Sequence, residues 1–275
     1  MQYDYSKIDQ ASVTHFLFHP RPDIAPPPPS EAIDCSIPVD TDIAIHARFH
    51  MKKTDSPNIL FFHGNGEIVS DYDDLGPIYH QYEINFIAAD YRGYGKSTGA
   101  PTATALMKDA HTVFKYVVDW LAKNGYTGPT IIMGRSLGSA PALEIAANFS
   151  EDIAGLIIES GFASTVKLLS RLGIPTHQLG IEEKDGFNNL QKIAFCMKPT
   201  LIMHAQNDVI IPISDAENLQ SYCGARNKQF HMVPRADHNN ILMVAGKIYF
   251  ELIQSFCNTI EGKRIKKFYR KNRSS

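Results

Sequence analysis

The clearest indication of the fold is the stretch Thr130-Ile-Ile-Met-Gly-Arg-Ser136-Leu-Gly-Ser-Ala140. A short apolar run precedes a Gly-x-Ser-x-Gly pattern, and an alanine-rich run to Asn148 follows it. This order predicts a buried strand, a sharp turn and the start of a helix, which together raise the serine above a sheet. The helix N-terminus supplies backbone N–H groups and the positive end of a dipole. Ser136 is therefore the candidate nucleophile, and an idle serine in a glycine-rich turn is the alternative.

Short apolar runs recur on both sides of this stretch and are separated by segments with helical spacing. Such runs are typical of strands buried on both faces, as in a parallel sheet covered by helices. They cover residues 58–62, 85–89, 130–133, 153–158, 200–203 and 230–233. Helices are predicted over Thr102–Lys123 and Asn239–Ile260, and Ile33–Phe49 is expected to form an antiparallel hairpin that turns at residues 40–42. The predicted fold class is α/β, with a mostly parallel sheet of about eight strands flanked by helices.

A serine nucleophile needs a general base, and the base needs a carboxylate that orients it. In a sheet of this type the acid and then the base follow the serine along the chain, in loops after later strands. Asp208 follows the apolar run 200–203, and His238 follows the run 230–233. The expected catalytic residues are therefore Ser136, Asp208 and His238.

Three other residues compete for these roles. His231 falls inside a predicted strand, which favours a structural core histidine. His204 precedes the acid in the chain, so it has the wrong order for the base. Asp237 adjoins His238, but adjacent side chains on a turn rarely face each other.

The oxyanion of a tetrahedral intermediate needs two preorganised backbone donors. The N–H of Leu137, directly after the candidate nucleophile, is expected to be one of them. The second is expected from the loop Phe61-Phe-His63-Gly-Asn65-Gly-Glu67, whose glycines let the backbone approach a substrate. The N–H of Asn65 is favoured, and the other N–H groups of this loop remain candidates.

Composition excludes several classes of protein. The chain has 275 residues, 44% of them hydrophobic, so it can bury a sizeable core. Its 27 basic and 29 acidic residues give a net charge of −2, which argues against a polyanion-binding protein. The four cysteines lie far apart, so buried free thiols are expected rather than a disulfide or zinc framework. No apolar run approaches the ~18 residues that span a bilayer, and a soluble, cytoplasmic protein is expected.

The chain is predicted to have three parts. Residues 1–30 form an N-terminal extension, and its six prolines between positions 20 and 29 indicate an extended connector. Residues 31–261 form the α/β domain. Within it, the segment 162–199 is too long for a tight crossover and is expected to contain a small helical cap over the pocket. Residues 262–275 form a basic C-terminal tail.

The basic tail bears on the expected partners. Residues 263–275 hold seven basic and no acidic residues, interleaved with Ile265, Phe268 and Tyr269. This pattern predicts peripheral contact with an anionic membrane through Lys263–Arg273, and a solvated C-terminus is the alternative. No nucleic-acid-binding fold accompanies the tail, so nucleic acid is not an expected partner. The expected substrate is a small or acylated molecule, and the sequence leaves the oligomeric state open.

Taken together, these segments resemble the α/β-hydrolase superfamily over roughly residues 31–260. The resemblance rests on His63-Gly-Asn-Gly, Asp90-Tyr-Arg-Gly-Tyr-Gly-Lys-Ser97, the serine motif, the Asp208 and His238 loops, and segments 18–22 and 187–193. The Asp90–Ser97 segment is similar to a group of α/β-hydrolase-domain serine hydrolases that includes protein depalmitoylases. That resemblance implies that Asp90 and Arg92 shape a turn and have a structural role. Members that act on membrane lipids usually carry an N-terminal transmembrane helix or a cysteine cluster, whereas residues 1–30 contain no cysteine.

The sequence thus predicts a serine hydrolase that cleaves a carboxylic ester or thioester, with an acyl or lipid-like group, through an acyl-serine intermediate. No metal or organic cofactor is expected to take part. A serine peptidase of the aminopeptidase or oligopeptidase type is one alternative. A weakly active scaffold recruited through the basic tail is another.

Overall fold

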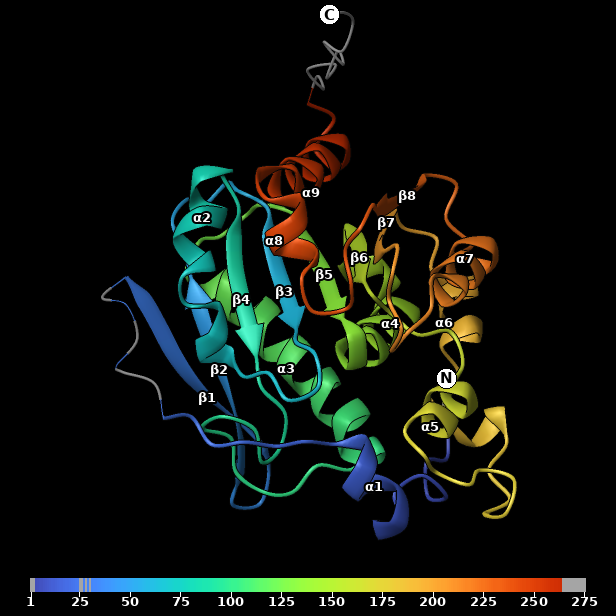
Figure 1. The fold of residues 1–275 in the computed structure, drawn as a ribbon. Helices are drawn as coiled ribbons and strands as arrows, with labels where there is room; N and C mark the ends of the chain where they lie inside the picture. The colour runs from blue at the N-terminus through green and yellow to red at the C-terminus, as the bar shows by residue number, and fades with distance from the viewer. Residues whose placement is uncertain (1–2, 25–26, 28, 30, 264–275) are drawn as a thin grey trace, which may run out of the picture.

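The centre of the molecule is an eight-stranded sheet in the order β1-β2-β4-β3-β5-β6-β7-β8 (Figure 1). A computed structural model describes residues 3–24, 27, 29 and 31–263 of the chain. The strands are β1 (Ala32–Asp40), β2 (Ile43–His50), β3 (Asn58–Phe62), β4 (Asn85–Ala89), β5 (Thr130–Arg135), β6 (Gly155–Glu159), β7 (Thr200–Ala205) and β8 (Lys228–Val233). β2 pairs antiparallel with β1 and with β4, and every other neighbouring pair is parallel. This topology confirms the predicted α/β fold.

Helices cover both faces of the sheet. One face packs against α2 (Leu75–Gln81) and α9 (Lys247–Ile260), and the other against α3 (Ala103–Lys123), α4 (Ser139–Asn148) and α6 (Asn189–Phe195). α7 (Ile213–Tyr222) lies beside α6. Every residue of β3, β4, β6 and β7 is buried, because these inner strands have a helical layer on each side. Figure 1 shows α3 behind the strands and α2 and α9 on the opposite side.

Several predicted boundaries coincide with the observed ones. The apolar runs 58–62 and 85–89 are β3 and β4, and the predicted hairpin is β1 with β2. The predicted helix over Thr102–Lys123 is α3, which begins one residue later because Thr102 is its N-cap. The Thr102 hydroxyl accepts a hydrogen bond from the N–H of Ala105 at 3.0 Å, which satisfies a donor that the helix itself leaves unpaired.

Two expectations about the C-terminal part are wrong. β8 is not buried on both faces, because it is the edge strand of the sheet and most of its residues, His231 among them, are only half-buried. The helix expected over Asn239–Ile260 is broken into α8 (Ile241–Ala245) and α9. Gly246 separates them with a φ of +54°, a conformation that glycine adopts without strain.

The N-terminal segment packs into the hydrophobic core, although the sequence predicted no helix there. It contains α1 (Ala11–Leu17), and Tyr5, Ile8 and Val13 are buried in the layer that holds α3 and α4. The Tyr5 hydroxyl lies 3.1 Å from the buried ammonium of Lys192 in α6. The segment is thus joined to the helical layer by both apolar and polar contacts.

The segment predicted to hold a cap contains α5 (Thr165–Arg171), a short 3-10 turn, η4 (Glu183–Asp185), and α6. α6 is part of the helical layer, since it packs against α4 and α7. Figure 1 places α5 at the end of the sheet toward which the β3 and β5 arrows point. Within residues 3–24 and 31–263, no helix is both long and apolar enough to cross a membrane. The basic tail from residue 264 onward, and part of the proline-rich connector, lie outside the described residues.

Candidate active site

Ser136 stands on a sharp turn between β5 and α4. Its φ is +52°, in the left-handed region that non-glycine residues rarely adopt. The turn is tight enough that a Cβ on Gly134 would lie 2.2 Å from the carbonyl oxygen of Gly138. A Cβ on Gly138 would lie 2.0 Å from the carbonyl oxygen of Phe62, at the end of β3. Both glycines of the motif are therefore required by space, and the second one brings the turn against the loop after β3.

Of the three residues predicted as a triad, His238 lies within hydrogen-bond distance of both Ser136 and Asp208. Nε2 of His238 is 2.9 Å from Oγ of Ser136, and Nδ1 of His238 is 2.6 Å from Oδ2 of Asp208. All three side chains are buried or nearly so, with Ser136 8% exposed. They come from loops after β5, β7 and β8, at the carboxyl ends of parallel strands, where open α/β sheets place their sites.

Two backbone N–H groups of the Asp208 loop hold one oxygen of its carboxylate. Oδ1 of Asp208 accepts hydrogen bonds from the N–H groups of Ile210 at 3.0 Å and Ile211 at 2.8 Å. Burial acts to raise the pKa of Asp208, but the hydrogen bonds from His238 and from the backbone N–H of Ile211 hold it below its usual range. Asp208 is therefore an anion that faces Nδ1 of His238 and leaves Nε2 directed toward Ser136.

The competing residues have other partners. Nε2 of His204 lies 2.7 Å from the carbonyl oxygen of Ile211 and 3.6 Å from Asp208, so His204 supports the acid loop. Asp237 is exposed and accepts a hydrogen bond from the N–H of Asn239 at 2.9 Å. His231 lies on the edge strand β8, away from these contacts.

The loop after β3 carries the other predicted oxyanion donor. The N–H of Gly64 donates to Oε2 of Glu67 at 2.6 Å and is therefore already engaged. Leu137 follows Ser136 in the 3-10 turn η2 (Ser136–Gly138), and N–H groups in the first turn of a helix have no partner within it. These contacts favour the N–H of Asn65, rather than that of Gly64, as the donor opposite Leu137.

The side chain of Asn65 is held by the N-terminal segment. Its Oδ1 accepts hydrogen bonds from the N–H of His19 at 2.9 Å and from the Tyr94 hydroxyl at 2.6 Å. Its Nδ2 donates to the carbonyl oxygen of Leu17 at 3.0 Å. The amide is thus fixed on three sides, which orients the backbone at this position.

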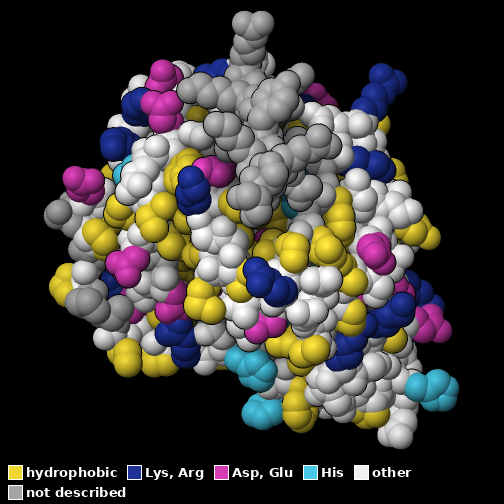
Figure 2. Space-filling model, turned by 45° about the horizontal axis from the view of Figure 1, so that its top comes forward, with side chains coloured by type: hydrophobic (Ala, Val, Ile, Leu, Met, Phe, Trp, Pro, Cys, Tyr) yellow, Lys and Arg dark blue, Asp and Glu magenta, His cyan; other side chains and the backbone are white. Residues whose placement is uncertain are grey.

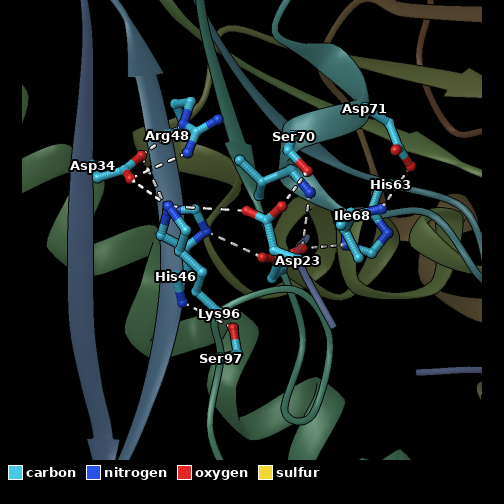
Figure 3. Close-up of polar contacts among 12 residues, drawn as sticks. Asp23, Asp34, His46, Arg48, His63, Ile68, Ser70, Asp71, Lys96 and Ser97 are labelled. Carbon is cyan, nitrogen blue, oxygen red and sulfur yellow. Dashed lines mark hydrogen bonds and ion pairs between the residues drawn. The ribbon is translucent and has the colours of Figure 1, made fainter. Parts of the chain in front are cut away.

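A polar network around the buried Asp90 lies beneath the loop after β3 and reaches solvent at Asp34 (Figure 3). His46 connects Asp34 and Asp90, with its Nε2 3.1 Å from Asp34 and its Nδ1 3.2 Å from Asp90. Nε2 of His63 lies 3.2 Å from the other oxygen of Asp90. Burial acts to raise the pKa of Asp90, and the hydrogen bonds from His46, His63 and the N–H of Val69 lower it. The structural role that the resemblance implied for Asp90 agrees with these contacts.

A second cluster, around Arg135, was not found from the sequence. Arg135 occupies the first variable position of the Gly-x-Ser-x-Gly pattern and pairs with both Glu67 and Glu159. Its Nη2 also donates to the carbonyl oxygen of His238 at 2.8 Å. A cavity of about 280 Å3 adjoins this cluster. Its lining residues are Phe61, Glu67, Asp71, Tyr72, Leu75, Arg135, Glu159, Asn239, Ile241, Leu242 and Tyr249. A charged residue directly before the serine was the only sequence signal for this cluster.

Metal and thiol chemistry have few candidates here. Within the described part of the chain, no three His, Cys, Asp or Glu side chains are arranged to hold a metal ion. All four cysteines are free and buried, which agrees with the expected free thiols.

The chain is similar in sequence to proteins of several organisms. A family model described as serine aminopeptidase, S33, matches residues 55–179. The human alpha/beta hydrolase domain-containing protein 17B is 30% identical over 213 residues, which cover 73% of this chain and 67% of the human protein. Protein bem46 of Schizosaccharomyces pombe is 27% identical over 205 residues, which cover 73% of this chain and 67% of the yeast protein. Other matches span as little as 56% of the relative, as for the Caenorhabditis elegans protein aho-3.

Solved structures share the fold. The Pyrococcus furiosus esterase Pf2001 superposes with a TM-score of 0.70 at 16% identity, over 87% of this chain and 98% of the esterase. At this identity the likeness concerns the arrangement of strands and helices, and the chemistry has to be argued from the side chains.

Proposed function

The chain belongs to the α/β-hydrolase superfamily, and from that premise we propose that it is a serine hydrolase that cleaves carboxylic esters or thioesters. The observation that carries the proposal is the hydrogen-bonded series Ser136–His238–Asp208, with distances of 2.9 Å and 2.6 Å. A serine hydroxyl is a weak nucleophile until a neighbouring base accepts its proton. Nε2 of His238 is in position to accept it.

The proposed reaction has two halves. In the first, Oγ of Ser136 attacks the acyl carbon while Nε2 of His238 takes the hydroxyl proton, and Asp208 stabilises the imidazolium that forms. The N–H groups of Leu137 and Asn65 stabilise the oxyanion. The C–O or C–S bond then breaks, and His238 returns the proton to the leaving group. In the second half, His238 takes a proton from a water that attacks the acyl-serine. The acyl–Oγ bond then breaks, His238 returns the proton to Oγ of Ser136, and the acid product is released.

An apolar acyl group is the proposed substrate feature. Val209, directly after Asp208, is 85% exposed, and Met243 of α8, a few residues after His238, is 78% exposed. Figure 2 shows hydrophobic side chains gathered across the middle of one face, between charged ones. Exposed apolar side chains in the segments that follow the acid and the base favour a hydrophobic ligand over a polar one.

A peptide bond is the second candidate, because the family model that matches residues 55–179 is described as a serine aminopeptidase. The same three residues would serve that reaction. The two candidates differ in the bond that is cleaved, so esters, thioesters and anilides separate them.

The test is hydrolysis of p-nitrophenyl esters from C2 to C16, of matched acyl thioesters and of aminoacyl p-nitroanilides, each with wild type and Ser136→Ala. We expect ester or thioester turnover that has a chain-length optimum and is lost in Ser136→Ala. Turnover of the anilides alone would replace the proposal by the peptidase. Equal inactivity of both proteins on all three series would contradict it.

We also propose that the basic segment Lys263–Arg273, almost all of it outside the described residues, brings the enzyme to anionic membranes. Basic residues near an anionic leaflet gain about 1 kcal/mol each. Flotation with vesicles that contain phosphatidylserine, for the full chain and for a chain ending at residue 262, tests this. Loss of flotation with unchanged ester turnover is expected, and equal flotation of both chains would contradict the proposal.

A further inference from the structure

Arg135 joins the end of β6 to two loops beside the candidate triad. It stands at the end of β5, between β3 and β6 in the sheet. Its Nε lies 3.2 Å from Oε1 of Glu159, its register partner on β6. Its Nη1 pairs with Oε1 of Glu67 in the loop after β3. Its Nη2 donates to the carbonyl oxygen of His238, in the loop after β8, at 2.8 Å.

The other oxygens of the two carboxylates are also occupied. Oε2 of Glu67 accepts hydrogen bonds from the Tyr72 hydroxyl at 2.5 Å and from the N–H of Gly64 at 2.6 Å. Oε2 of Glu159 accepts one from the Tyr249 hydroxyl at 2.6 Å. The carboxylates of Glu67 and Glu159 are therefore each held in one position. A planar guanidinium with a fixed fork of donors suits such a site better than an ammonium.

Close packing restricts this cluster further. A Cβ on Gly64 would lie 2.5 Å from Nη1 of Arg135, so the guanidinium lies directly against the backbone of the loop after β3. The position of this loop and the position of the His238 backbone are thus set by the same side chain. Neither contact involves a reacting atom.

On this basis, and resting on the proposed serine hydrolase function, we propose that Arg135 is a positioning residue that holds the base loop and the oxyanion loop in register with Ser136. Glu67 transmits this to Gly64 by engaging its N–H, which leaves the N–H of Asn65 directed toward the substrate. A small displacement of reacting groups reduces rate by as much as 10²-fold, so loss of this cluster should reduce turnover rather than substrate binding.

The test compares Arg135→Met with Arg92→Met. Arg92 is a matched control, because its side chain is 11% exposed, as is that of Arg135, and it forms a two-point pair with Asp109 at 2.6 Å and 2.8 Å. kcat and KM for one p-nitrophenyl ester, the rate constant of fluorophosphonate labelling and the melting temperature are measured for each. Arg135→Lys keeps the charge without the fork and is included as the conservative variant.

We expect Arg135→Met to reduce kcat and the labelling rate by about tenfold or more, with KM within about twofold of wild type. The kcat and labelling rate of Arg135→Lys should lie between those of wild type and Arg135→Met. Arg92→Met should lower the melting temperature with kcat within about twofold of wild type. If Arg135→Met does not fold, Glu67→Gln breaks the same connection with an isosteric side chain and is judged by the same criterion.

The experiment distinguishes failure of the positioning role from failure of the proposed function. If wild type is labelled and Arg135→Met or Glu67→Gln has a wild-type kcat, the positioning role is wrong and the cluster is structural only. If wild type itself is neither labelled nor active, the proposed function fails, and the positioning role fails with it.

Discussion

Oγ of Ser136 lies 2.9 Å from Nε2 of His238, and the serine reaches this position with a φ of +52°. A left-handed conformation costs an L-residue roughly 1–2 kcal/mol. The turn that imposes this cost is the one that places the hydroxyl against the base. Stability and activity should therefore respond in opposite directions to substitutions at this position.

Replacement of Ser136 by glycine should stabilise the fold relative to replacement by alanine. Both variants lack the hydroxyl, but only alanine keeps the Cβ that is strained at this φ. We expect Ser136→Gly to exceed Ser136→Ala by about 1 kcal/mol in the free energy of unfolding, measured by urea denaturation. Equal stability of the two variants would mean that the turn is not strained.

Asp208→Asn should abolish most activity while the fold is kept. An amide facing Nδ1 of His238 favours the tautomer that carries the proton on Nε2, which then cannot accept the proton of Ser136. The expected loss in kcat is on the order of 10⁴-fold, as in other serine triads. Asp237→Asn is the control, since Asp237 adjoins His238 but is exposed and bonds to the Asn239 backbone. Similar kcat values for the two variants would contradict the role given to Asp208.

Asn65→Ala tests whether the N-terminal segment orients the oxyanion loop. The substitution keeps the backbone N–H but removes the hydrogen bonds to Leu17, His19 and Tyr94. We expect kcat to fall about tenfold with little change in KM, less than the 10²- to 10³-fold cost of losing an oxyanion donor. Tyr94→Phe removes one of the bonds and should have a smaller effect. An unchanged kcat in Asn65→Ala would show that these side-chain hydrogen bonds do not orient the oxyanion loop.

The buried network around Asp90 predicts a pH dependence of stability. The pKa of Asp90 is lower in the folded chain than in the unfolded chain, where it is about 3.9. Its contribution is therefore complete above that pH and is lost as the pH falls through the folded-state pKa. Asp90→Asn should lower the free energy of unfolding at pH 7 by about 2 kcal/mol, because His46, His63 and the N–H of Val69 lose a buried anionic hydrogen-bond partner.

The pH curve gives the control for this prediction. Stability of Asp90→Asn should vary less steeply below pH 5 than that of wild type, whereas the exposed substitution Asp119→Asn should leave the wild-type slope. Parallel curves for wild type and Asp90→Asn would show that Asp90 does not titrate with folding.

The central fold was predictable because its signals are local. Inner strands such as β3 and β4 are continuous apolar runs, since both of their faces are covered. The turn at Ser136 requires two glycines, so a few consecutive residues are enough to predict it. The chain order of serine, acid and base then predicted Asp208 and His238, which the structure brings together with Ser136.

The remaining features depend on contacts between distant segments. The run 230–233 within β8 resembled the apolar runs of the inner strands, and the strand order identifies it as an edge. α1 is stabilised by the burial of Val13 and Leu17 in the hydrophobic core. No local sequence pattern predicts this burial. The Arg135 cluster combines residues from the ends of β5 and β6 and from two loops, so its charges could be placed together only in three dimensions.

The role of Ser136 as the nucleophile is tested by the mass of the intact protein after reaction with a fluorophosphonate, followed by peptide mapping. We expect a single adduct, on Ser136, in wild type and in Arg92→Met, and no adduct in Ser136→Ala or His238→Ala. Absence of an adduct in folded wild type, or an adduct that persists in Ser136→Ala, would contradict the claim that Ser136 is a nucleophile activated by His238.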